Sequence, residues 1–230
     1  MESSSRQEIL EERTVAGLHA ALFEEITQVA GIGPAASILD LGCGSGAWLA
    51  RLGAAGFKNL YGVDSEIAQC GFPNAIYSTA DLNWSMELPF PDSSFDLICA
   101  IEVIEHLENP GNFLRLIGRY LRPEGYLLLT TPNIHSAIAR LRFLLTGKLR
   151  QFDSKGDPTH IYPVYLPALK RLLVCHGLKI HSIWSFPGDG TVIASRFSVR
   201  LVARVLSALI PEHHAGETVC MLISAERSKR

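Results

Sequence analysis

The sequence lacks any run of about 18 apolar residues, so we expect no membrane-spanning helix. It also lacks an apolar segment at its start, where residues 1–5 are polar, and this argues against a signal peptide. None of its five cysteines belongs to a Cys-x-x-Cys pair. Their odd number and wide spacing favour reduced thiols. Together these absences predict a cytoplasmic protein.

The sequence also lacks a large excess of either positive or negative charge. The 230 residues carry a formal net charge of −2, so no global basic field would attract nucleic acid. Apolar residues make up 47% of the chain and charged residues 19%, which is typical of a folded globular protein. The length fits one domain with a sizeable core and is short for two. We therefore expect a single domain over residues 1–230, with nucleic acid disfavoured as a partner.

Short apolar segments alternate with helical patterns along the chain. Strands are expected at residues 37–42, 59–64, 75–78, 95–101 and 125–131, and helices at 7–30, 45–56 and 106–121. The last third is expected to hold helices at 134–146 and 163–176 and strands at 178–185 and 219–225. Strands that alternate with helices imply right-handed crossovers, so the fold class is α/β with a mainly parallel sheet.

The strongest motif is a glycine-rich loop after the first expected strand, in the segment Ile38–Gly46 (ILDLGCGSG). Glycine has no side chain, so a ligand can lie directly against the backbone of this loop. Open α/β sheets bind ligands at the carboxyl ends of their strands. Gly42, Gly44 and Ala47 also satisfy the G-x-G-x-x-G/A pattern of dinucleotide-binding dehydrogenases. Asp40 argues against that alternative, because its carboxylate would repel a pyrophosphate and attract an ammonium group.

Two more acidic residues follow expected strands. Asp64 ends the second strand, where a carboxylate can accept hydrogen bonds from both hydroxyls of a ribose. Asp81 follows the third strand and is placed to contact the amino group of an adenine. With the glycine loop, these residues predict a site for an adenosine-containing ligand that also carries an ammonium group.

The segment Asp40–Gly46, Asp64, Asp81–Leu82 and the run Phe95–Cys99 jointly resemble the successive motifs of class I S-adenosylmethionine-dependent methyltransferases. The resemblance covers residues 37–131. It implies a Rossmann-like, seven-stranded, mostly parallel sheet of order 3-2-1-4-5-7-6, with the last strand antiparallel and helices on both faces. It also implies S-adenosylmethionine as cofactor, bound by Asp40, Gly42, Cys43, Gly44, Gly46, Asp64, Ser65, Asp81, Leu82 and Ile101.

The same resemblance divides the expected domain into three parts. Residues 1–36 are an N-terminal helical segment, residues 37–133 are the cofactor-binding core, and residues 134–230 form the acceptor pocket and the C-terminal part of the sheet.

The segment after the fourth expected strand should carry the acceptor chemistry. Its Glu102, Glu105 and His106, with the later His160, could hold a divalent metal ion through oxygen and nitrogen ligands. This spacing resembles metal-dependent O-methyltransferases of the ubiquinone-biosynthesis and small-RNA 2′-O-methyltransferase types. The resemblance implies an ion that lowers the pKa of the acceptor hydroxyl, while His106 or His160 takes the proton. Methyltransferases without a metal often carry Glu-His-Leu here too, with Glu105 as a helix cap and His106 as pocket wall.

Basic residues gather in the last third of the chain. Residues 135–150 carry Arg140, Arg142, Lys148 and Arg150 with no acidic residue, and residues 194–210 carry Arg196, Arg200 and Arg204. Three interpretations stay open. These residues could contact an anionic membrane while Phe143, Leu144 and Leu145 dip into it. They could instead hold an acceptor that bears a phosphate or carboxylate, or form a solvated face over a core stripe.

The sequence thus predicts an enzyme that methylates a small-molecule acceptor, with O-methylation of a phenol, a quinol or a lipid-like hydroxyl favoured. One alternative is an RNA 2′-O-methyltransferase that uses the Glu/Glu/His metal site. Another is a non-catalytic, cofactor-binding partner subunit. Peripheral contact with a membrane is compatible with the first prediction, and the sequence leaves the oligomeric state open.

Overall fold

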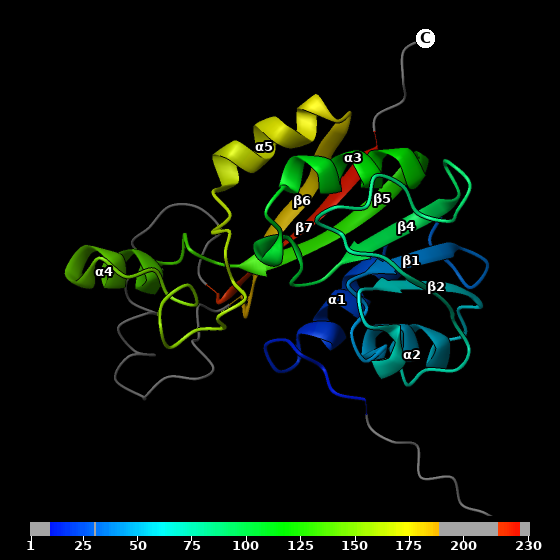
Figure 1. The fold of residues 1–230 in the computed structure, drawn as a ribbon, viewed down its shortest axis with the longest axis horizontal. Coiled ribbons are helices and arrows are strands. Elements are labelled where there is room, and N and C mark those ends of the chain that lie inside the picture. Colours follow the sequence, from blue (N-terminus) through cyan, green and yellow to red (C-terminus); the bar gives the residue numbers. More distant parts are fainter. Residues whose placement is uncertain (1–9, 30, 189–215, 226–230) are drawn as a thin grey trace, which may run out of the picture.

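The computed structural model describes residues 10–29, 31–188 and 216–225, and it contains one seven-stranded sheet (Figure 1). The strand order is β3-β2-β1-β4-β5-β7-β6. The strands are β1 (Ser37–Leu41), β2 (Asn59–Asp64), β3 (Ile76–Thr79), β4 (Phe95–Ala100), β5 (Leu121–Pro132), β6 (Leu178–Phe186) and β7 (Thr218–Ala225). The pairs among the first five strands are parallel, and β7 runs antiparallel to both β5 and β6. The predicted order and the antiparallel last strand are confirmed.

Both faces of the sheet are covered by helices, because the strands are apolar on both sides. In β1, Ile38 packs in one hydrophobic cluster and its neighbour Leu39 in the other. Helices α1 (Leu18–Thr27) and α2 (Ala47–Ala54) bury their apolar positions on the Ile38 side. Helices α3 (Pro110–Tyr120) and α5 (Leu166–Cys175) cover the Leu39 side, at the top of Figure 1. The helices on both faces match the prediction.

Two predicted helix starts are wrong, and local backbone chemistry explains both. The helix expected at 106–121 begins at Pro110, because the Asn109 side chain accepts a hydrogen bond from the Asn112 amide and proline fits the first helical turn. Residues Ile104–His106 form a separate short 3₁₀ helix, η2. The helix expected at 7–30 begins only at Leu18, after Gly17 in the left-handed conformation.

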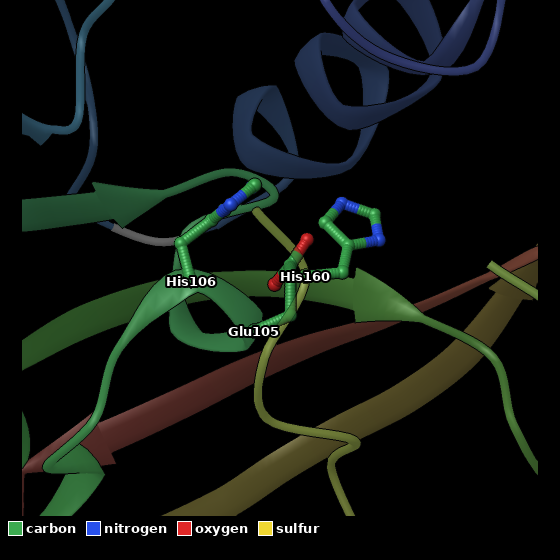
Figure 2. A group of neighbouring side chains, drawn as sticks. All are labelled: Glu105, His106 and His160. Atoms are coloured by element: carbon green, nitrogen blue, oxygen red, sulfur yellow. The ribbon is translucent and has the colours of Figure 1, made fainter. Parts of the chain in front are cut away.

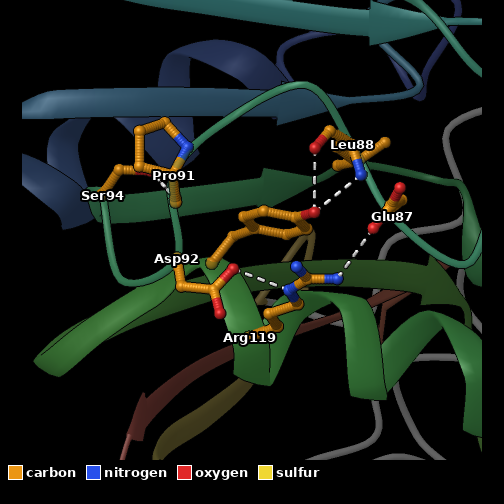
Figure 3. Close-up of polar contacts among 7 residues, drawn as sticks. Glu87, Leu88, Pro91, Asp92, Ser94 and Arg119 are labelled. Carbon is orange, nitrogen blue, oxygen red and sulfur yellow. Dashed lines mark hydrogen bonds and ion pairs between the residues drawn. The ribbon is translucent and has the colours of Figure 1, made fainter.

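A polar cluster fixes the long connection between β3 and β4 (Figure 3). The buried hydroxyl of Tyr120 accepts from the Leu88 amide at 2.6 Å and donates to the Leu88 carbonyl at 2.9 Å. Beside it, Arg119 pairs with Asp92 at 2.6 Å and with Glu87 at 3.5 Å. The end of α3 therefore holds the loop that leads into β4, and β4 in turn carries the chain into the site described below.

The connection from β5 to β6 carries helices α4 (Ala137–Thr146) and α5. Ser136 caps α4 by accepting from the Ala139 amide, and Gly147 ends it in the left-handed conformation. Figure 1 shows α4 standing away from the sheet, in contrast to α5. The basic segment predicted at 194–210 lies outside the described residues. Within the described part of the chain, no helix has the length and apolarity needed to cross a membrane.

Candidate active site

The glycine loop lies at the carboxyl end of β1, where the chain turns toward α2. Gly42, Gly44 and Gly46 all have positive φ angles, of 73°, 51° and 81°. A Cβ atom at Gly42 would stand 2.6 Å from Cγ2 of Val103, and one at Gly46 would stand 2.9 Å from the Tyr77 hydroxyl. A Cβ atom at Gly44 would meet no protein atom within 4 Å. The loop thus needs glycine for its conformation and, at two positions, for its packing.

Two carboxylates lie beside this loop. Asp64, at the end of β2, accepts hydrogen bonds from the Gly44 amide at 2.9 Å and from the Glu66 amide at 3.1 Å. Asp40 in β1 is only 3% exposed. Burial, reinforced by the negative charge of Asp64, holds the pKa of the Asp40 carboxyl well above its usual range. A cation bound beside Asp40 would relieve both effects, and this fits the ammonium group of the methionine part of S-adenosylmethionine.

A cavity of about 810 Å³ opens above the loop, and its size suits a cofactor. All of the predicted cofactor residues line it except Gly46, which lies under the Tyr77 hydroxyl. Those lining residues are Asp40, Gly42, Cys43, Gly44, Asp64, Ser65, Asp81, Leu82 and Ile101. The residues predicted from the sequence are thus brought to one cavity by four different strand ends.

The N-terminal segment forms a wall of the cavity that sequence reasoning missed. Residues 11–16 line it in an irregular segment that turns into α1, with His19 in the first turn of that helix. The Ser45 hydroxyl of the glycine loop donates to the Glu11 carbonyl at 2.8 Å, and Arg51 of α2 pairs with Glu12 at 2.7 Å. These contacts join residues more than 30 positions apart. No local pattern could have indicated them.

A second group of side chains, Glu105, His106 and His160, lies close together beside the glycine-loop residues of the cavity (Figure 2). Glu105 and His106 come from η2, and His160 comes from the loop before α5. Their potential ligand atoms lie within 4.8 Å of one another, and the two imidazole rings meet edge to face with centroids 4.7 Å apart. Both imidazoles line the cavity. The structure therefore brings together three of the four predicted metal ligands.

Hydrogen bonds orient both imidazoles. Thr159 donates its hydroxyl proton to Asp157 at 2.6 Å, so the Thr159 oxygen, 2.9 Å from Nδ1 of His106, acts as an acceptor there. Nδ1 of His160 lies 3.0 Å from the Gln151 carbonyl, which can only accept. Both rings are therefore protonated at Nδ1, and their Nε2 atoms are left to accept a proton or a metal. Burial, together with His160, lowers the pKa of His106.

The two carboxyls beside the imidazoles differ in their surroundings. Glu105 is fully buried, with one oxygen accepting from the Thr131 hydroxyl at 3.1 Å and Oε1 without a partner among the described residues. Burial, and then the charge of Glu102, raise the pKa of Glu105 well above its usual range. Glu102 accepts from Thr130 at 2.8 Å, has a φ of 53°, and has its pKa raised to about 7 by burial.

Glu102 is therefore placed differently from the prediction. Glu102 lines the cavity, and it is not part of the group formed by Glu105, His106 and His160. Glu105 offers a carboxylate oxygen and each histidine offers a ring nitrogen, and this donor set of oxygen and nitrogen suits a divalent cation.

The sheet order, the glycine loop and the acidic strand ends define the Rossmann-like fold of class I S-adenosylmethionine-dependent methyltransferases. A methyltransferase domain model matches residues 12–183, and the chain belongs to this family. A solved methyltransferase of Archaeoglobus fulgidus, described as S-adenosylmethionine-dependent, shares the fold with a TM-score of 0.60 and 21% identity, over 90% of this chain and 92% of that one.

Curated relatives match part of the chain. A probable S-adenosylmethionine-dependent methyltransferase of Mycolicibacterium smegmatis is 33% identical over 66% of this chain and 56% of its own length. A ubiquinone biosynthesis O-methyltransferase of Azorhizobium caulinodans is 34% identical over 42% of this chain and 40% of its own length. The matches thus span about half of these relatives or less.

Proposed function

We propose that this chain transfers the methyl group of S-adenosylmethionine to a hydroxyl of a small molecule, with a phenol, a quinol or a lipid-like hydroxyl as the favoured acceptor. One observation carries this proposal. The imidazoles of His106 and His160 line the same cavity as Asp40 and Asp64, so groups that can take a proton lie beside the cofactor residues. The Azorhizobium caulinodans relative, which is named as an O-methyltransferase, is consistent with this choice.

The cofactor, when bound, supplies an electrophilic methyl group on sulfonium sulfur. Asp40 would hold its ammonium group, since no described residue forms an ion pair with this buried carboxylate. Asp64 would accept the ribose hydroxyls, while the Gly44 and Glu66 amides keep its carboxylate in place. Asp81 would contact the adenine amino group from the rim of the cavity. These residues fix the position of the reacting carbon relative to the acceptor wall.

The acceptor hydroxyl becomes a stronger nucleophile when it loses its proton. The Nδ1 atoms of His106 and His160 contact Thr159 and Gln151, so the Nε2 atoms are the ones that can take this proton. The lowered pKa of His106 keeps that ring neutral near pH 7. Thr159 donates to Asp157 and accepts from Nδ1 of His106, and these two hydrogen bonds fix the orientation of the His106 ring. A positioned base of this kind contributes roughly 10²–10⁴-fold to a rate.

The same group would alternatively hold a divalent metal ion. Glu105, His106 and His160 would be its ligands, with Glu102 as the neighbouring carboxylate. The ion would act as a Lewis acid that lowers the pKa of the acceptor hydroxyl. In that case the imidazoles serve as ligands, and the backbone contacts at their Nδ1 atoms fix the ring orientation.

We also propose that two of the three predicted parts of the domain divide the work. The core, residues 37–133, would bind the cofactor, and the region from residue 134 onward would shape the acceptor side. The cavity walls support this division, since Gln151, Asp157, Thr159, His160 and Glu217 all come from the later region.

The test is a radiolabelled methyl-transfer assay with catechol and an oligoribonucleotide as acceptors. We expect label in the methyl ether of catechol, and a decrease of about 100-fold or more in kcat for His160→Asn. His176→Asn is the matched control, because His176 ends α5 and does not line the cavity. Label in RNA instead would favour 2′-O-methylation. Absence of cofactor binding would contradict the proposal itself.

Titration with Mn²⁺, followed by electron paramagnetic resonance, separates the two roles of the histidine group. Bound Mn²⁺ that is lost in both Glu105→Gln and His160→Asn would assign the group to a metal. Transfer that is insensitive to chelator, with no Mn²⁺ bound, would leave the imidazoles as proton acceptors alone.

A further inference from the structure

The outer end of α4 exposes three consecutive large apolar side chains. Phe143, Leu144 and Leu145 are 52%, 80% and 73% exposed. Successive residues on a helix point about 100° apart, so three exposed neighbours mean that this end of α4 is open on most of its circumference. Figure 1 shows α4 standing clear of the sheet. Contiguous apolar surface of this kind marks an interaction site.

Basic residues flank this apolar end, and no acidic residue lies between positions 134 and 152. Two of the four cations are already used, because Arg142 pairs with Asp153 and Arg150 pairs with Glu217 at 2.8 Å. Arg140 and Lys148 are exposed and make no ion pair with any described residue. The apolar end thus carries available positive charge, and the nearby carboxylate of Asp153 is paired with Arg142.

For residues 135–150, the structure favours the membrane interpretation over the other two. A site for an anionic acceptor would need these cations at the cavity, yet neither Arg140 nor Lys148 lines it. A solvated face over a core stripe would bury the apolar residues and expose only the charged ones. Here Leu144 and Leu145 are themselves exposed. A lipid bilayer with anionic headgroups matches both features, since apolar side chains enter the acyl boundary and cations meet the headgroups.

We propose that α4 docks this chain on an anionic phospholipid surface through Phe143, Leu144 and Leu145, with Arg140 and Lys148 at the headgroups. This docking goes beyond the proposed reaction and does not depend on it.

The docking helix is connected directly to the acceptor side of the cavity. The Arg142–Asp153 ion pair joins α4 to the loop that follows it. From that loop, Gln151 and His160 line the cavity. A docked α4 would therefore hold this wall of the cavity close to the bilayer, where an acceptor with an apolar tail is concentrated.

Co-sedimentation with vesicles tests the docking with the full chain. One set of vesicles contains phosphatidylcholine alone, and the other contains equal parts of phosphatidylcholine and phosphatidylglycerol. We expect binding to the anionic vesicles that weakens as salt is raised. Leu144→Ser with Leu145→Ser should lower the partition coefficient by roughly tenfold or more, because burying one leucine side chain already contributes about that factor. Arg140→Gln with Lys148→Gln should lower it by about fivefold per charge, on anionic vesicles only.

Val174→Ser is the matched control, since Val174 is 71% exposed on α5 and lies outside this surface. It should bind like the unmodified chain, and thermal melting should show that all variants are folded. Equal binding by the leucine variant and the control would overturn the proposal, as would no binding to anionic vesicles. Sedimentation velocity tests whether a second copy of the chain covers this surface instead. A dimer that the two leucine substitutions dissociate would mean that a second copy of the chain covers this surface, which also overturns it.

Discussion

Asp40→Asn is expected to weaken cofactor binding and to stabilise the cofactor-free protein at the same time. The buried Asp40 carboxyl lies near the charge of Asp64, and its pKa is raised. Its ionised form therefore costs folding free energy at neutral pH, and a neutral amide of the same shape removes that cost. An ammonium group beside position 40 would in turn lose its charged partner.

The two effects have different sizes and signs. Loss of a hydrogen bond to a charged group is worth about 1.5–3 kcal/mol, so the affinity for S-adenosylhomocysteine should fall by roughly 10- to 150-fold. Removal of the buried charge should raise the free energy of unfolding by about 1 kcal/mol, which is roughly 2–4 °C in Tm for a chain of this length. Calorimetric titration and thermal melting of the same samples measure both.

The size of this stability effect depends on pH. For an acid whose pKa is raised by folding, the penalty is absent below the unfolded pKa and grows as the pH rises toward the folded value. The variant and the unmodified chain should thus have the same Tm near pH 4, about the pKa of an ordinary aspartate, and differ at pH 7.

Asp64→Asn is the contrasting variant and should lose stability, because the amides of Gly44 and Glu66 donate to its carboxylate. If Asp40→Asn destabilised the protein as well, Asp40 would be a structural acceptor and the reasoning would be refuted.

Three further predictions concern the same region. The affinity for S-adenosylhomocysteine should fall as the pH is lowered through the raised pKa of Asp40, and titrations across pH should show no such fall in Asp40→Asn. Gly42→Ala should cost about 1–3 kcal/mol in a denaturant melt, because its φ is 73° and the added Cβ would meet Val103 at 2.6 Å; an unchanged midpoint would contradict this. Tyr120→Phe should cost about 1–3 kcal/mol, because both polar groups of buried Leu88 lose a partner, and amide exchange at Leu88 should accelerate.

Much of the cofactor side was predictable because its signals are local. The strand, the glycine loop and the start of α2 occupy one contiguous segment, and each glycine serves a backbone conformation that the pattern indicates directly. Asp64 and Asp81 follow strands that the apolar runs also marked. Since parallel strands present their carboxyl ends at one edge, the sequence was enough to predict that these side chains meet.

The N-terminal wall and the histidine group needed the tertiary structure. The path of residues 11–16 depends on contacts with Ser45 and Arg51, and helical spacing alone predicted a longer helix there. His106 and His160 are 54 positions apart, and only the folding of the loop before α5 brings their rings together.

By itself, the sequence indicated the α/β fold class, and its resemblance to class I methyltransferases implied the strand order, which the structure confirms, and the residues expected to bind the cofactor. The signals behind them are short apolar runs, glycines and acidic residues at strand ends, which act within a few residues. The tertiary structure decided that Glu102 stands apart from Glu105, His106 and His160, and that the apolar end of α4 faces outward. The physical reason is the same in both cases. Spacing along the chain limits which side chains can share a helical turn, but packing against distant elements decides which of them meet and which stay exposed.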